Sequence, residues 1–221
     1  MKKEDNRKRA GQIVKLLKKE YGKTRIFLNH KTNFQLLIAT ILSAQCTDKK
    51  VNEVTRSLFE KYKKPVDFAG AKQEVLELEV RQTGFFRNKA KNVISCSARI
   101  CDVYKGKVPD SMEDLISLAG VARKTANIVL SSAYGKAEGI AVDTHVKRLS
   151  NRLGLSDEKN PDKIEKDLMA VVKRKDWIDM NYLLISHGRK VCAAKKSDCQ
   201  ACVLKKMCPS SRRNRPCYDK L

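Results

Sequence analysis

Four cysteines near the C-terminus are spaced closely enough to hold one metal centre. Cys192, Cys199, Cys202 and Cys208 form a C-x6-C-x2-C-x5-C array, and the other four cysteines of the chain are scattered singly. Four thiolates can bind a zinc ion or an iron-sulfur cluster, and spacing alone does not choose between them. A disulfide pair is the alternative, but the charged segment Met1–Arg9 lacks the apolar core of a secretory signal, so we expect none. The array predicts a metal site.

Positive charge surrounds this array and is spread over the whole chain. The chain contains 47 Lys and Arg against 25 Asp and Glu, a formal net charge of +22. Such a charge is typical of proteins that bind phosphate backbones, although a solvated lysine-rich surface is the alternative. Around the array the basic residues favour thiolate over thiol and provide a cationic surface. They are Arg189, Lys190, Lys195, Lys196, Lys205 and Lys206.

Residues 115–130, LISLAGVARKTANIVL, predict two short helices joined by a tight turn, a helix-hairpin-helix. Gly120 lets the backbone turn without a Cβ penalty, and N–H groups at the start of the second helix can then point toward a phosphate. We expect Gly120, Val121, Ala122 and Arg123 to bind DNA in this way. A glycine between two helices is often only a connector, and the surrounding charge is what favours the DNA interpretation.

The elements that carry these residues are predicted to be helices throughout. Apolar residues recur at helical spacing almost everywhere, and residues 35–44 are apolar on nearly all sides, as expected for a buried helix. Asp110 with Glu113 fits a capping box, and Asn160 followed by Pro161 fits the start of a helix. The sequence therefore predicts an all-α fold, without repeats or linkers.

The longest apolar stretch, residues 34–44, is too short to cross a bilayer, so we expect an intracellular, cytoplasmic protein with no membrane partner. In a reducing compartment Cys46, Cys96, Cys101 and Cys217 are expected to be free thiols. The first three are expected to pack in helices as small apolar residues. Cys217 lies in a basic tail and receives no role.

Five motifs make the chain similar to the endonuclease III family of DNA repair glycosylases, over about residues 25–208. They follow the family's order: LSAQCTD at 42–48, TGFFRNKA at 83–90, LAGVARKTAN at 118–127, VDTH at 142–145, and HGRKVC leading into the cysteine array. This resemblance implies that the cysteines hold a [4Fe-4S] cluster. It also implies that the partner is double-stranded DNA with damaged bases or abasic sites, bound by a monomer.

The hairpin departs from the family's usual Leu-Pro-Gly-Val-Gly at two positions, Ala119 and Ala122. We expect Ala122 to adopt a backbone geometry that glycine accepts more readily, or the hairpin to be shifted slightly. The expected cost is a modest weakening of phosphate binding.

The resemblance further implies that Lys124 is a nucleophile and Asp143 a catalytic carboxylate. A neutral lysine amine can attack the sugar C1′ and form a Schiff base that permits strand cleavage. We expect a helix start, neighbouring Arg123 and a partly desolvated cleft to disfavour the ammonium form of Lys124. Asp143 precedes the helical pattern of Val146 and Leu149, so it is expected at a helix start, with its orientation fixed.

Two further positions match residues that the family inserts into DNA. Gln45 could hydrogen-bond an orphaned base, and Phe85, after Gly84, could wedge between base steps once the target base leaves the stack. A polar helix terminus and a core phenylalanine are the structural alternatives. Lys195 and Lys196, in the loop between the first two array cysteines, are the basic residues expected to meet phosphate.

The resemblance implies a two-domain helix-hairpin-helix DNA glycosylase fold. A six-helix domain, about residues 26–137, would contain the hairpin at about 113–134. It would pack on an iron-sulfur cluster domain made from residues 1–25 and 138–221, with the cluster loop at 192–208. Lys124 and Asp143 would then face one cleft.

The expected activity is that of a bifunctional DNA glycosylase and abasic-site lyase that excises oxidised pyrimidines and nicks the strand by β-elimination. The alternatives are a mismatch-specific adenine or thymine glycosylase and a non-catalytic iron-sulfur DNA-binding protein. Adenine-specific relatives typically carry a further C-terminal domain, and monofunctional ones usually lack the lysine found at 124. Intact Lys124 and Asp143 argue against a non-catalytic protein.

Overall fold

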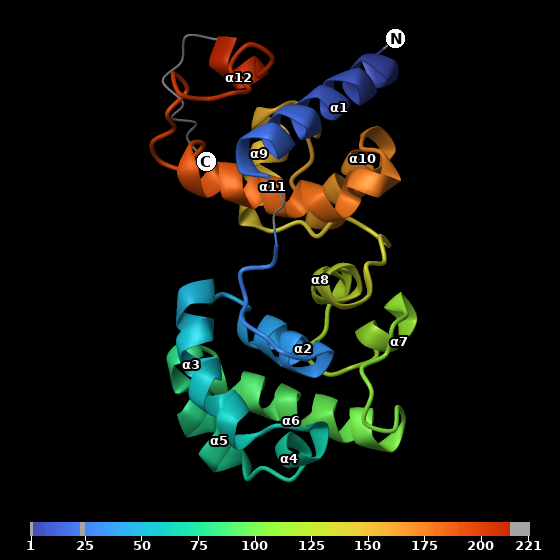
Figure 1. Cartoon of the computed structure of the whole chain (residues 1–221), viewed down its shortest axis with the longest axis vertical. Coiled ribbons are helices and arrows are strands. Elements are labelled where there is room, and N and C mark those ends of the chain that lie inside the picture. The colour runs from blue at the N-terminus through green and yellow to red at the C-terminus, as the bar shows by residue number, and fades with distance from the viewer. Residues whose placement is uncertain (1, 23–24, 213–221) are drawn as a thin grey trace. The chain divides into compact units, whose positions relative to one another are not determined.

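The computed structural model describes residues 2–22 and 25–212, so Cys217 lies outside the described part of the chain. Within these ranges the protein is all-α, as predicted, and forms no β-strand (Figure 1). The chain divides into two compact units, each with its own hydrophobic core. One is contiguous, Ile26–Glu138, and the other joins the N-terminal segment up to Arg25 to the residues from Gly139 onward. The sequence-based division at 137/138 differs from this one by a single residue.

The contiguous unit, all of whose residues are described, contains seven α-helices and one 3-10 helix, where six helices were expected. Two of the seven have only five residues. The elements are α2 (Asn33–Leu42), α3 (Asp48–Lys61), α4 (Pro65–Ala69), α5 (Gln73–Val80), η1 (Arg81–Thr83), α6 (Phe86–Asp102), α7 (Met112–Ile116) and α8 (Arg123–Tyr134).

Helix α2 forms the centre of this unit. Every residue from Phe34 to Leu42 is buried, as the apolar sequence predicts, and α2 contacts α3, α6 and α8. Three aromatic rings pack together in the core. Phe68 packs edge-on against Phe34 with ring centroids 5.6 Å apart, and the ring centroids of Tyr62 and Phe68 are 4.7 Å apart. Such burial of apolar surface is the main stabilising contribution to a domain of this size.

Helix α7 begins one residue later than the sequence suggested. Ser111, not Asp110, is its N-cap: the Ser111 hydroxyl accepts a hydrogen bond from Asp114 N at 3.1 Å and donates to the Asp114 carboxylate at 2.7 Å. Asp110 is instead paired with Lys136, with 2.6 Å between Nζ and Oδ2. The prediction of an Asp110 cap was therefore wrong, because the neighbouring Ser111 makes the capping hydrogen bonds with Asp114.

The discontinuous unit is also helical. Its described elements are α1 (Lys2–Tyr21), α9 (Thr144–Arg152), α10 (Pro161–Val171), η2 (Arg174–Asp176), α11 (Trp177–Lys190) and α12 (Pro209–Arg212). The predicted start of α10 is confirmed: Asn160 Oδ1 accepts from the backbone N–H groups of Asp162 and Lys163, and Pro161 follows.

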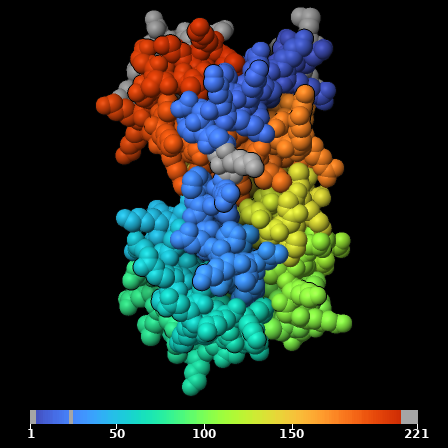
Figure 2. Space-filling model, viewed as in Figure 1, coloured from blue at the N-terminus to red at the C-terminus, as the bar shows by residue number. Residues whose placement is uncertain are grey.

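Helix α1 packs on the C-terminal part of the chain. It contacts α10 and α11, and its Ile13 and Leu17 are fully buried. Figure 2 shows the dark blue surface of α1 against orange and red surface from the last third of the sequence. Lys18 Nζ joins the helices by pairing with Asp176 at 2.7 Å and Asp179 at 2.6 Å. Neither α1 nor any other helix in the described part of the chain is both long and apolar enough to cross a bilayer.

The isolated cysteines differ in their surroundings. Cys96 is fully buried in α6, and burial raises the pKa of its thiol to about 12. Cys101 is half-buried near the end of the same helix. Cys46 does not lie in a helix, contrary to expectation, because α2 ends at Leu42 and α3 begins only at Asp48.

Candidate functional site

The predicted hairpin is present between α7 and α8. Leu118 and Val121 are buried and anchor the turn to the core, whereas Gly120 is exposed with a φ of +77°. A Cβ atom on Gly120 would lie 2.9 Å from the Cβ of Asn92 on α6. Glycine is thus required here for two reasons, the left-handed backbone conformation and the close approach of α6.

Ala122, the N-cap residue of α8, has an ordinary backbone conformation. Its φ of −89° and ψ of 169° lie in the extended region open to any residue. The expectation of a glycine-like geometry was therefore wrong. Ala122 also provides no side-chain cap, so the first N–H groups of α8 receive no acceptor from it. With the positive end of the helix dipole, these groups form a suitable site for an anion.

Lys124 is the second residue of α8 and lies on the exposed surface with Ala122 and Arg123. The segment from Gly120 to Lys124 combines a backbone anion site, a guanidinium group and an amine.

Asp143 is the N-cap of α9, as the sequence predicts. Its Oδ1 accepts a hydrogen bond of 2.8 Å from Val146 N, which fixes the carboxylate, and the residue is half-buried. The preceding residues, Ile140, Ala141 and Val142, are buried and hold the segment in place. A negative charge at this position is favoured by the dipole of α9.

Gln45 and Phe85 are both exposed residues in left-handed backbone conformations. Gln45 has a φ of 53° and lies beyond the end of α2 rather than in it. Phe85 has a φ of 48° and its side chain is 63% exposed, so it is not a core phenylalanine. Phe86 packs against the core instead. Non-glycine residues in this region cost about 1–3 kcal/mol and are concentrated at functional sites.

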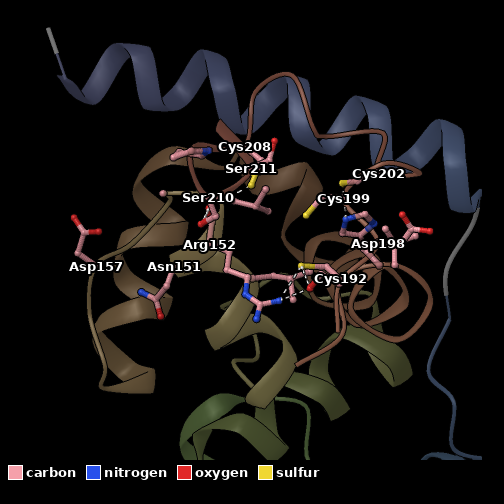
Figure 3. Close-up of a pocket in the computed structure, with 17 residues that line it drawn as sticks. Asn151, Arg152, Asp157, Cys192, Asp198, Cys199, Cys202, Cys208, Ser210 and Ser211 are labelled. Carbon is pink, nitrogen blue, oxygen red and sulfur yellow. Dashed lines mark hydrogen bonds between the residues drawn. The ribbon is translucent and has the colours of Figure 1, made fainter. Parts of the chain in front are cut away.

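The four array cysteines line one cavity in the discontinuous unit. It has a volume of about 210 Å³, and Figure 3 shows Cys192, Cys199, Cys202 and Cys208 around it. Cys192, Cys202 and Cys208 are free thiols, whereas Cys199 is disulfide-bonded. Among the residues that the structure describes, no three His, Cys, Asp or Glu side chains are arranged to hold a single metal ion.

Arg152 holds the first cysteine of the array and the loop that follows it. Its guanidinium group is buried and donates to Cys192 Sγ at 3.3 Å (Figure 3). It also donates to Ala193 O at 2.8 Å and to Ala194 O at 3.1 Å. The hydroxyl of Ser197 accepts from the same group at 2.8 Å. Because the buried charge is satisfied by these acceptors, the loop is held in one conformation.

His187 lies beside another cysteine. It is 2% exposed, with Nε2 3.4 Å from Cys202 Sγ and Nδ1 2.8 Å from the Tyr21 hydroxyl. Burial lowers the pKa of His187 to about 4, so its imidazole is neutral at physiological pH. Burial also raises the pKa of Tyr21 to about 12, so its hydroxyl remains a donor. This arrangement fits the tautomer in which Nδ1 accepts from Tyr21 and Nε2–H donates to the sulfur.

Sequence reasoning missed Arg152 and His187 as residues of the cysteine site. His187 opens the HGRKVC motif, which was a usable signal, but nothing local to Arg152 indicates its contact 40 residues along the chain. Lys195 and Lys196 are exposed on the loop that Arg152 holds. Their contact with phosphate stays a prediction.

Comparison with known proteins gives one consistent answer. Residues 38–174 match the HhH-GPD superfamily of base excision DNA repair proteins. Endonuclease III of Synechocystis sp. is 49% identical over 207 residues, covering 93% of this chain and 94% of that protein. Endonuclease III of Bacillus subtilis is 44% identical over 182 residues, covering 82% and 83%. A solved trapped endonuclease III–DNA covalent intermediate shares 39% identity and a TM-score of 0.88, covering 93% of this chain and 96% of that one.

We predict that Gly120→Ala destabilises the contiguous unit more than Gly135→Ala. Both glycines have positive φ, but no atom lies within 4 Å of a Cβ added at Gly135. Each substitution should cost about 1–2 kcal/mol for the left-handed conformation. Gly120→Ala should cost about 1–3 kcal/mol more from its clash with Asn92. Urea unfolding followed by circular dichroism measures the difference, and equal losses would contradict the tight packing described for Gly120.

Proposed function

Because this chain belongs to the endonuclease III family, and so is a DNA glycosylase and abasic-site lyase of base excision repair, we propose that it excises oxidised pyrimidines from duplex DNA and nicks the strand by β-elimination. One observation carries the proposal. Lys124 is the second residue of a helix whose start has no side-chain cap, directly after the hairpin turn. A short segment therefore offers a phosphate site and an amine together.

In the proposed reaction Lys124 is the nucleophile. Its neutral amine bonds to the sugar C1′ as the C1′–N bond to the damaged base breaks, and the base leaves with a proton. Ring opening gives a Schiff base, loss of a proton from C2′ then breaks the C3′–O bond, and water finally releases the lysine. Lys124 is exposed in the protein, so its amine is accessible to the sugar of a bound nucleotide.

Asp143 is proposed to act as the catalytic carboxylate. Its hydrogen bond to Val146 N leaves the second carboxylate oxygen able to assist deprotonation and to stabilise positive charge that develops on the sugar. The same hydrogen bond and the buried residues before it restrict the carboxylate to one orientation. A fixed charge costs no reorganisation when the reaction occurs.

DNA is proposed to be bound mainly through its phosphates. The uncapped start of α8, Gly120, Val121 and Arg123 would hold one phosphate, and Lys195 with Lys196 would hold another part of the backbone. The net charge of +22 supports binding of this kind. Exposed Gln45 and Phe85 would fill the gap that the extruded base leaves.

The cysteine cavity is proposed to hold a [4Fe-4S] cluster through Cys192, Cys199, Cys202 and Cys208. Four cysteines line one cavity, three of them as free thiols, and Arg152 and His187 direct N–H donors at two of the sulfurs, which supports such a group. When bound, the cluster would supply structural cross-linking of this segment. Arg152 would keep the loop with Lys195 and Lys196 in place.

Replacing the nucleophile tests the lyase assignment. We expect wild-type protein to form a covalent adduct with abasic-site and thymine glycol duplexes in borohydride, and Lys124→Ala to form none while still binding DNA. As a control, Lys72→Ala removes the same charge from an exposed site on the same unit, and it should form the covalent adduct as the wild type does. Absence of an adduct with wild-type protein would remove the assignment.

Asp143→Asn separates the chemical role of this residue from its structural one. Asparagine is as good an N-cap as aspartate, so α9 should keep its start and the protein its stability. Loss of the charge should lower the single-turnover rate of base release by about 10²–10⁴-fold, with DNA affinity retained. Near-normal turnover would refute the proposed role.

The cluster is tested by metal analysis of the intact protein. We expect about four iron and four sulfide ions per chain and a brown colour. Cys202→Ser should lower both contents, whereas Cys101→Ser, which changes a half-buried thiol outside the array, should not. Stoichiometric zinc in place of iron would overturn the assignment.

A further inference from the structure

Lys89 is a buried lysine that makes two hydrogen bonds to the backbone. Lys89 is 4% exposed, and its Nζ donates to Leu42 O at 2.8 Å and to Thr83 O at 2.7 Å. Burial lowers the pKa of Lys89, while the Cys46 thiol opposes this shift. Even a neutral amine keeps two N–H donors, so both carbonyls stay satisfied in either protonation state.

The two carbonyls lie at the bases of two separate loops. Leu42 is the last residue of α2, three residues before Gln45, and Thr83 is the last residue of η1, two residues before Phe85. The backbone N–H of Lys89 also donates to Phe85 O at 3.1 Å. Lys89 therefore contacts the backbone of Phe85 and of Thr83, two residues before it. Through Leu42 it also joins the Phe85 loop to the loop that carries Gln45.

Both loops need such support because each contains a strained residue. Gln45 and Phe85 hold left-handed conformations that a non-glycine residue keeps only when its surroundings enforce them. In the first loop, Cys46 N donates to Ser43 O and Ser43 Oγ donates to Thr40 O. These bonds fix the first turn internally, whereas the two bonds of Lys89 Nζ connect this loop to the one that carries Phe85.

We propose that Lys89 is a positioning residue that sets the spacing of the Gln45 and Phe85 loops, so that both side chains enter DNA as one preformed unit. The inference rests on the proposed function, which assigns these side chains to the gap in the base stack. Preforming the unit removes the cost of ordering two loops when DNA binds. Lys89 then promotes extrusion of the base and leaves the reaction of Lys124 with an accessible sugar unchanged.

The test compares a reaction that needs extrusion with one that does not. Lys89→Met keeps the length of the side chain and removes both hydrogen bonds. We expect it to lower base release from a thymine glycol duplex, and the fluorescence change of a 2-aminopurine placed beside the lesion, by about tenfold or more. Borohydride trapping on a single-stranded abasic oligonucleotide should stay within about twofold of wild type.

Two controls accompany this variant. Ser97→Ala on the same helix removes a fully buried hydrogen bond to Val93 O without touching either loop, and it should leave all three measurements unchanged. Lys89→Arg keeps charged donors on a long side chain and should restore part of the base release. Phe85→Ala should have a smaller effect in Lys89→Met than in the wild-type protein, because the two act through one unit.

Three results would overturn the inference. They are wild-type base release by Lys89→Met, equal losses on the duplex and single-stranded substrates, and additive effects of Gln45→Ala and Phe85→Ala in the otherwise wild-type protein. The last measurement decides the matter if Lys89→Met does not fold. If the wild-type protein formed no adduct, the proposed function would fail, but the 2-aminopurine signal, which needs no catalysis, would still test Lys89.

Discussion

The structure depends on how the free N–H groups at helix starts are satisfied. Every helix leaves such groups without an internal partner, and here Thr32, Thr47, Ser111 and Asn160 supply side-chain acceptors for ordinary helices. The two helices of the candidate site use the same groups in opposite ways. Asp143 accepts a hydrogen bond at the start of α9 and is itself oriented by it, whereas Ala122 provides no side-chain acceptor at the start of α8. One backbone property thus orients a carboxylate in one place and is proposed to bind a phosphate in another.

Local sequence was sufficient for the hairpin and its neighbours, and insufficient where a distant residue decides the local structure. Helical spacing, the buried α2 and the Asn160–Pro161 start are consequences of neighbours within a few residues, so the sequence predicts them. Asp110 is not the cap of α7, because Ser111 takes that role and Asp110 pairs with the distant Lys136. The expected glycine-like backbone of Ala122 was wrong because a family motif does not specify backbone angles. Ala122 has an extended conformation.

The candidate site shows the same division between chemistry and support. The residues proposed to do chemistry stood out by type and spacing, since thiols, a hairpin lysine and a capping aspartate each have a recognisable pattern. The residues that support them did not. Arg152 meets Cys192 across 40 residues, and Lys89 reaches Leu42 across 47, so only a folded chain brings these partners together. Gln45 and Phe85 were identified from motifs, but their left-handed conformations, which make them need support, are visible only in the backbone.

The discontinuous unit has a consequence for synthesis on the ribosome. Residues 26–138 contain all the partners of their own core, so this part can fold as soon as it has been translated. Helix α1 is made first but buries Ile13 and Leu17 only after α10 and α11 emerge. The N-terminal helix must therefore wait, with an apolar face uncovered, while the whole contiguous unit is produced. The cysteine array, translated just before α12, completes a unit whose helix α1 was translated before the whole contiguous unit.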